Sequence, residues 1–369
     1  MLTGIIENIK FTPIFSQRLS EISFDDDVNN FPSRCLVKKD ETKLALSKWV
    51  SPKRTRSYPY SRVYDTFMTS AIQKITIIPL VKDEGLDGDR DYLQWDTVAL
   101  MSLLNVYIIL GYYNNADRNL RNPQKANKIT NQKLDSDYIK QKINEVSNCH
   151  ASALHWNLSQ LKPAELNSLM QKVIFSYQSI SNKLNVQMHN QSGLINFQNE
   201  IMVSSDDFKN YSRNKAISAQ NRESLTLQPK ESIGVGEKSK ILIKNYLGGY
   251  YYLTIDDLIK EDDELILTES KHSSNSALPS LDDIKDGLLK MIIFSNISKL
   301  ELNNNGWKFN AALRLTSRKL EGCITEKSSD IEIKEFLTVN ALNKKSELIS
   351  ELISGSRKNN FQLIIEGVK

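Results

Sequence analysis

The chain has 369 residues, of which 40% are hydrophobic and 25% are charged. These proportions are those of an ordinary globular protein, and they exclude a disordered, collagen-like or disulfide-dense chain. Its 48 basic and 44 acidic residues give a formal net charge of only +4, so any surface that binds nucleic acid must be local.

The cysteines and the hydrophobic segments indicate the compartment. Cys35, Cys149 and Cys323 are far apart and odd in number, which argues against a disulfide framework and favours a reducing compartment. The N-terminal segment MLTGIIENIKFTPIF lacks the long apolar region of a signal peptide, and no uncharged apolar stretch approaches the length of a transmembrane helix. We therefore expect a soluble cytoplasmic protein.

The N-terminal part, residues 1–202, is predicted to be an α/β region. A β-branched run at residues 74–81 predicts a buried strand, residues 98–104 a helix and residues 106–113 a second strand. Strand, helix and strand in this order indicate a βαβ-like unit. We expect this region to recognise DNA.

Polar and helical segments complete this region. Residues 114–135 are rich in Asn, Lys and Gln without apolar periodicity, so we expect a solvated loop. Apolar residues recur at helical spacing in residues 137–146 and 154–184, with Pro163 in the first turn of a helix.

The densest basic and aromatic cluster is the segment SKWVSPKRTRSYPYSR. Its cations are Lys48, Lys53, Arg54, Arg56 and Arg62, and its aromatic residues are Trp49, Tyr58 and Tyr60. Lysine and arginine neutralise phosphates, while Tyr and Trp can pack on sugars or bases. The segment is therefore our candidate for contact with the DNA backbone; an ordinary solvated loop is the alternative.

The C-terminal part, residues 203–369, has the clearest pattern. Three β-type runs, ILIKNY, YYYLTIDDLI and ELILTESK, are separated by glycines and by a charged turn. A helix at residues 281–297 follows, started by Pro279 and Ser280. Further strands are predicted at KLEL and AALRLTS.

The strongest chemical motif lies within this hairpin. Asp256 and Asp257 precede Glu269-Ser270-Lys271 by about one strand and a turn. The period of two along a strand places Glu269 and Lys271 on one face, with an aspartate of the preceding strand alongside. Converging carboxylates suit Mg²⁺, and a lysine can orient or deprotonate the attacking water and neutralise charge on a phosphate.

This order of D-D, a turn, E-S-K and a helix resembles the PD-(D/E)XK nuclease superfamily, and within it the type II restriction endonucleases. The resemblance implies a restriction-endonuclease-like core, a mixed β-sheet flanked by helices, over roughly residues 210–320. It implies catalytic roles for Glu269, Lys271 and one of Asp256 and Asp257. Asp257 is slightly preferred because it directly precedes the apolar pair Leu258-Ile259, but both remain candidates.

Three further residues are candidates by the same resemblance. Glu223 would add a metal ligand from the first core helix; an exposed helical glutamate is the alternative. Lys285 would face the active site or the DNA backbone, with a solvated helix face as the alternative. His272, which directly follows Lys271, is interpreted as a contact to phosphate or DNA.

An acidic loop offers a rival metal site. Its acidic residues are Asp83, Glu84, Asp87, Asp89 and Asp91. The alternate aspartates imitate a calcium loop, but Tyr92 and Val98 stand where that template needs Gly and Glu. A hydrogen-bonded structural loop is therefore favoured, and a metal held by Asp83 and Glu84 near Asp96 is the alternative.

The expected function is a Mg²⁺-dependent, site-specific endonuclease that acts on double-stranded DNA. By resemblance, a homodimer is expected, with a cognate DNA methyltransferase as genetic partner. Two alternatives stay open: a structure-selective repair or recombination nuclease with the same centre, and a non-catalytic DNA-binding protein whose hairpin carboxylates are only surface charges.

Overall fold

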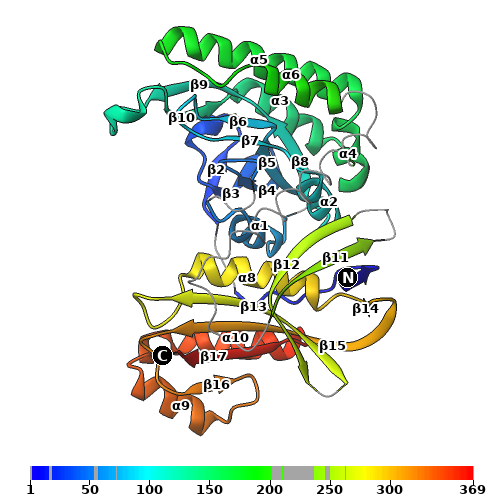
Figure 1. The fold of residues 1–369 in the computed structure, drawn as a ribbon, viewed down its shortest axis with the longest axis vertical. Coiled ribbons are helices and arrows are strands. Elements are labelled where there is room, and N and C mark those ends of the chain that lie inside the picture. The colour runs from blue at the N-terminus through cyan, green and yellow to red at the C-terminus, as the bar shows by residue number, and fades with distance from the viewer. Residues whose placement is uncertain are drawn as a thin grey trace. The chain divides into compact units, whose positions relative to one another are not determined.

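The structure is a computed structural model (Figure 1). It describes residues 2–15, 19–53, 57–71, 73–201, 210, 237–245, 250–261 and 263–368. The chain forms two compact units: unit 1 comprises Met1–Arg18 and Gln228–Lys369, and unit 2 comprises Leu19–Leu227. The N-terminal residues, which the sequence analysis grouped with the N-terminal region, thus belong to the same unit as the C-terminal part.

Unit 2 is built around a mixed sheet with the strand order β2-β3-β4-β5-β8. These strands are β2 (Glu21–Ser23), β3 (Arg34–Lys39), β4 (Thr42–Lys48), β5 (Gln73–Pro79) and β8 (Tyr107–Gly111). Strand β5 pairs in parallel with both β4 and β8. Helix α2 (Trp95–Leu103) lies between β5 and β8 in the chain, which confirms the predicted βαβ-like unit.

Helices and two hairpins surround this sheet. The helices are α1 (Pro59–Phe67), α3 (Ser136–Ser147), α4 (Ala153–Gln160), α5 (Pro163–Leu184) and α6 (Ser192–Ile201), with short 3-10 turns η1 (Val28–Asn30) and η2 (Pro123–Lys125). The hairpins are β6 (Val81–Asp83) with β7 (Arg90–Tyr92), and β9 (Tyr113–Arg118) with β10 (Ile129–Leu134). Pro163 begins α5 as predicted.

The solvated loop predicted at residues 114–135 is wrong, because β9 and β10 pair there as an antiparallel hairpin. Ala116, Ile129 and Leu134 are buried, each between polar neighbours. So few apolar residues make no recognisable period in the sequence, yet their burial against the rest of the unit orients the hairpin.

Unit 1 contains a closed arrangement of strands. In order around the ring they are β13 (Glu264–Ser273), β12 (Tyr250–Glu261), β11 (Glu237–Asn245), β1 (Leu2–Ile6), β14 (Lys299–Leu302) and β15 (Asn305–Ser317). The parallel pairing of β13 with β15 closes these six described strands into a mixed barrel. Strand β1 pairs in parallel with β11 and antiparallel with β14.

The sheet continues beyond the barrel through β15. Strand β17 (Gln362–Gly367) pairs in parallel with β15, and β16 (Cys323–Thr325) pairs antiparallel with β17. The remaining elements of this unit are α8 (Leu281–Phe294), α9 (Asp330–Val339), η3 (Asn343–Lys345) and α10 (Ser346–Lys358). Figure 1 shows α8 crossing beside β13, and α8 packs against both β13 and β15.

The predicted α/β class is confirmed, as is the local order of elements in unit 1. Strands β11, β12 and β13, then α8, then β14 and β15 occur where the sequence predicts them. Ser280 caps α8 by accepting a hydrogen bond from the backbone N–H of Asp283 at 3.1 Å. No helix of the described residues is long and apolar enough to span a bilayer.

Candidate active site

A β-bulge positions the two adjacent aspartates of β12. Leu258 pairs with Glu237 and Ile255 with Ser239, so Asp256 and Asp257 together lie opposite the single residue Lys238 of β11. Such an extra residue interrupts the alternation of faces and bends the strand. The two aspartates therefore lie in different surroundings.

Asp256 lies where β12 and β13 separate. Their antiparallel ladder runs from Glu261–Glu264 to Asp257–Thr268 and goes no further. Beyond its end, Oδ2 of Asp256 accepts a hydrogen bond from the backbone N–H of Ser270 at 2.9 Å. The Asp256 carboxylate thus acts as acceptor in place of a main-chain carbonyl of the ladder. It also lies close enough to Glu269 for its charge to raise the pKa of that carboxyl.

Glu269 and Lys271 lie together on the face of β13 that packs against α8. Nζ of Lys271 is 3.0 Å from Oε1 of Glu269 and 2.6 Å from Oδ2 of Asp286 on α8. Gly287 makes room for this contact, because a Cβ there would lie 3.4 Å from Cε of Lys271 and 2.7 Å from a methyl group of Leu313. The strand and the helix thus hold one lysine between two carboxylates.

A second lysine reaches the same glutamate. Lys290 on α8 donates a hydrogen bond to Oε2 of Glu269 and another to the carbonyl of Thr254 at 3.2 Å. Glu269 is only 1% exposed. Burial raises the pKa of its carboxyl, the charge of Lys290 opposes that shift, and the charge of Asp256 adds to it; the net direction is upward.

Lys271 remains a cation in this setting. Burial alone would lower the pKa of its ammonium group, but the charges of Glu269 and Asp286 outweigh burial and raise that pKa above its ordinary value. A lysine with a raised pKa is a poor general base at neutral pH and a good stabiliser of negative charge.

Asp257 and His272 lie on the opposite face from Glu269. Asp257 pairs with Thr268 in the ladder, and its Oδ2 is 3.8 Å from the guanidinium of Arg314. His272 is exposed, with Nδ1 2.9 Å from the hydroxyl of Thr316. The slight preference for Asp257 is therefore not supported, since the bulge directs Asp256 toward the glutamate.

The donor set suits a hard divalent cation such as Mg²⁺. Asp256 and Glu269 offer carboxylate oxygens from adjacent strands, and Oδ1 of Asp256 accepts no hydrogen bond from the described part of the chain. No cluster of three or more His, Cys, Asp or Glu side chains that could hold a metal occurs within that part. Two carboxylates fit Mg²⁺, which usually keeps waters and substrate oxygens as its other ligands.

Two further candidates remain, Lys285 and Glu223. Lys285 is on α8 but fully buried, so neither a solvated helix face nor a direct phosphate contact describes it. Glu223 lies outside the described residues.

Two aromatic residues of the basic and aromatic segment lie in the core of unit 2. Trp49 and Tyr60 are buried with ring centroids 6.4 Å apart, edge to face. Lys48 donates to the carbonyl of Val28 at 2.7 Å, and Arg62 to the carbonyl of Lys48 at 2.6 Å. Burial lowers the pKa of Lys48 to about 8. Lys48 and Arg62 therefore bond to the main chain.

Among the other members of that segment, Lys53 and Tyr58 are exposed. Lys53 is exposed, which leaves it available to a phosphate, whereas Arg54 and Arg56 lie outside the described residues. The proposed stacking of Trp49 on bases is wrong, because its ring is in the core.

The acidic loop is structural, as favoured from its sequence. Asp83 is paired with Arg90 at 2.6 Å, and Glu84 with Lys82 at 2.8 Å and Lys128 at 3.1 Å. The loop is therefore held by ion pairs within unit 2, which agrees with the favoured interpretation of a hydrogen-bonded structural loop.

Sequence reasoning missed Asp286 and Lys290. The two residues are four apart on α8 and so lie on one face of the helix. That face meets the E-S-K strand, because the helix directly follows it and packs back upon it. The charged i, i+4 pair on the helix that follows the E-S-K strand was the available signal.

Comparison with known proteins gives no match. No protein-family model matches the chain, and no curated protein or solved structure is significantly similar to it.

Proposed function

We propose that the chain is a Mg²⁺-dependent endodeoxyribonuclease with a centre like that of the PD-(D/E)XK superfamily. The observation that carries this proposal is the convergence of Asp256, Glu269 and Lys271 where β12 and β13 separate. Its setting supports the same interpretation: an antiparallel meander is followed by a helix and by a strand parallel to the one that carries E-S-K.

Asp256 and Glu269 would hold the Mg²⁺ ion. When bound, the ion supplies Lewis-acid stabilisation of a phosphoryl oxygen and lowers the pKa of a water molecule. Glu269 is kept in place by two lysines, since Lys290 of α8 and Lys271 of its own strand contact its two oxygens separately. A buried carboxylate with fixed partners cannot rotate away from the adjacent strand, so the geometry of the pair is set before substrate arrives.

Lys271 would stabilise the negative charge that develops on the phosphate. Its raised pKa keeps it protonated at neutral pH, and its side chain is 17% exposed, so the ammonium group can be reached from solvent. Asp286 contacts it at 2.6 Å and orients it. Lys271 therefore acts in this proposal as a cation rather than as the base that deprotonates water.

The substrate and assembly are proposed from the resemblance. The substrate would be double-stranded DNA with a fixed recognition sequence, cut by a homodimer whose two centres act on the two strands. A cognate methyltransferase would protect the host sequence. Lys53 is the one described cation of the basic segment that is exposed for backbone contact.

The test is incubation of the purified protein with unmethylated phage DNA, with Mg²⁺ and with EDTA, resolved on a gel. Discrete bands that need Mg²⁺ would support a site-specific endonuclease, whereas a smear, or cutting only at flaps and junctions, would favour a less specific or structure-selective nuclease. No cleavage of several DNAs, together with no Mg²⁺ binding, would overturn the proposal in favour of a non-catalytic binding protein.

The variant that checks the centre is Lys271→Met. It should abolish cleavage and leave DNA binding unchanged in an electrophoretic mobility shift. The matched control is Lys308→Met, which removes an exposed lysine from neighbouring β15 and should cut like the wild type. Full cleavage by the Lys271 variant would remove the role assigned to this residue.

A further inference from the structure

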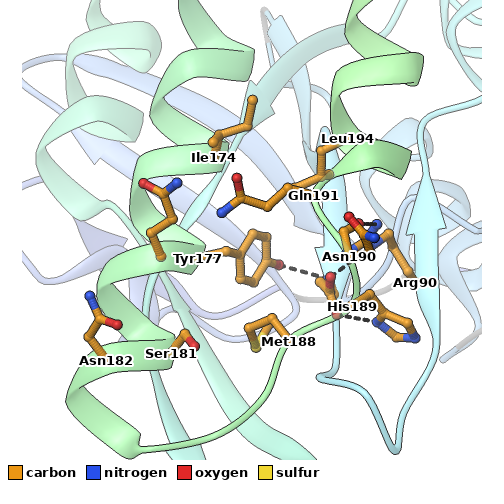
Figure 2. A pocket seen from close by; sticks show the side chains of 12 residues that line it. Arg90, Ile174, Tyr177, Ser181, Asn182, Met188, His189, Asn190, Gln191 and Leu194 are labelled. Atoms are coloured by element: carbon orange, nitrogen blue, oxygen red, sulfur yellow. Dashed lines mark hydrogen bonds and ion pairs between the residues drawn. The ribbon is translucent and has the colours of Figure 1, made fainter.

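Unit 2 contains a polar cavity that has no part in the nuclease proposal. Its volume is about 490 Å³, and it lies between α5, the hairpin β6–β7 and the segment that joins α5 to α6. Figure 2 shows Tyr177 and Asn182 of α5 on one side, and Arg90 and His189 on the other.

Asp83 anchors the wall of this cavity. Its Oδ1 accepts from the backbone N–H of Gly85 at 2.9 Å and pairs with Nδ1 of His189 at 2.7 Å. Its Oδ2 accepts from Nε of Arg90 at 2.6 Å. The carboxylate is 1% exposed and already has three donors, so its charge is compensated and it offers little to a ligand.

Arg90 is incompletely satisfied. Its side chain is only 9% exposed. Nε bonds to Asp83 and Nη1 donates to the carbonyl of Asn190 at 2.9 Å. Nη2 is buried and has no hydrogen-bond partner among the described residues. A buried guanidinium donor without an acceptor is costly, so this group favours a ligand oxygen.

The packing around Arg90 keeps the guanidinium at this position. A Cβ on Gly193, at the start of α6, would lie 2.7 Å from Nη1 of Arg90 and 3.1 Å from the hydroxyl of Tyr92. A side chain at Gly193 would therefore push the guanidinium aside. Asp83 holds the guanidinium through Nε.

His189 supplies a second group for a ligand. Because Nδ1 pairs with Asp83, the other ring nitrogen, Nε2, is left without a partner in the described structure, and the side chain is 26% exposed. Nε2 is thus the ring nitrogen left for a ligand, while the Asp83 carboxylate of the wall is already satisfied.

We propose that this cavity binds a small organic molecule that carries an oxyanion, either a phosphate or a carboxylate. The guanidinium of Arg90 and the ring of His189 would contact the oxyanion, since charge-assisted bonds to a guanidinium are strong and match the geometry of phosphate and carboxylate. The volume exceeds that of a free ion, and the apolar side chains Ile174, Met188 and Leu194 line the remaining space, which suits an organic body.

The test is isothermal titration calorimetry of the full chain with inorganic phosphate, adenosine 5′-monophosphate and succinate. Saturable one-site binding of any of them, weakened at least about tenfold by His189→Gln, is expected. The matched control is His155→Gln, an exposed histidine on α4, which should bind normally. Comparing the three probes separates a free ion, a phosphomonoester and a carboxylate as the source.

Gly193→Ala is the second variant, because it displaces Arg90 without removing a charge. It should also weaken binding, and a thermal melt shows whether it remains folded. No binding of any probe would overturn the proposal. Binding that neither variant changes, with both variants folded, would also overturn it.

Discussion

Lys290 donates a hydrogen bond from α8 to Oε2 of Glu269, while Lys271 contacts the other oxygen of the same carboxylate at 3.0 Å. The buried glutamate therefore lies between two ammonium groups, one from its own strand and one from the following helix. Together they compensate a charge that burial alone would disfavour.

Lys290→Met should make the protein less stable in EDTA but more responsive to Mg²⁺. Removing the ammonium leaves Oε2 of Glu269 buried without that partner, which costs about 1–3 kcal/mol. Added Mg²⁺ should then raise the melting temperature more than in the wild type, because no lysine competes at that oxygen. Thermal unfolding with EDTA and with Mg²⁺ measures both effects. If Lys290→Met loses no more stability in EDTA than Lys308→Met does, the contact between Lys290 and Glu269 would be contradicted.

Asp256→Asn and Asp257→Asn form a matched pair that tests the bulge. The first should lower the cleavage rate on the order of 10²–10³-fold and abolish Mg²⁺ binding, because it neutralises the aspartate beside Glu269. The second should cut normally, since Asp257 lies near Arg314 on the other face. Initial cleavage rates and calorimetry with Mg²⁺ check the pair. The opposite ranking would show that Asp257 is the ligand.

Gly287→Ala should impair the site through packing. The new Cβ would meet Leu313 at 2.7 Å and the Lys271 stem at 3.4 Å, so stability should fall by about 1–3 kcal/mol, and cleavage should fall through kcat. Gly306→Ala is the control, because its Cβ would meet nothing within 4 Å. Urea unfolding and steady-state kinetics measure the two. If Gly287→Ala and Gly306→Ala have the same stability and kcat, the close packing of Gly287 against Leu313 and Lys271 would be contradicted.

Ionisation of Glu269 should appear in the pH dependence of stability without metal. The folded protein keeps the Glu269 proton above the ordinary value of 4.5, where the unfolded chain has lost it. Between 4.5 and the raised pKa the folded state therefore binds more protons, and the free energy of unfolding should fall as pH rises. Urea midpoints of the wild type and Glu269→Gln, measured from acid to neutral pH, isolate this contribution. A wild type that gains stability relative to Glu269→Gln as pH rises would contradict the raised pKa.

The basic segment offers a contrast between Lys53 and Lys48. Lys53→Ala should reduce the slope of log affinity for DNA against log salt by about 1, the value for one lost phosphate contact. Lys48→Met should leave the slope unchanged and cost about 1 kcal/mol of stability, because its ammonium bonds to the carbonyl of Val28. Fluorescence anisotropy over a salt series provides the measurement. Equal slope changes would place Lys48 on the DNA as well.

The sequence predicted the hairpin and the helix after it because their signals are local. The apolar runs of β12 and β13 and the cap at Ser280 lie within a few residues of what they determine. The choice between Asp256 and Asp257 could not be made in this way. It depends on an extra residue opposite Lys238, and that register is set by pairing with a distant strand.

Longer-range features were out of reach for the same reason. Leu2–Ile6 form a strand that pairs with Ile241–Asn245 and with Lys299–Leu302, and nothing within the N-terminal segment names those partners. Trp49 and Tyr60 illustrate the converse error. The basic and aromatic composition of the segment around them suggested a nucleic-acid surface, but aromatic rings beside cations are equally common where a core meets the surface.

The place of β1 in the barrel also bears on the order in which the protein can fold during synthesis. Strand β1 leaves the ribosome before unit 2, yet both its neighbours, β11 and β14, emerge only after unit 2 has been made. Closure further requires β15 beside β13. A nascent chain would thus carry the residues of the candidate centre before the ring around them is complete, and a fragment that starts at residue 203 would lack the strand between β11 and β14.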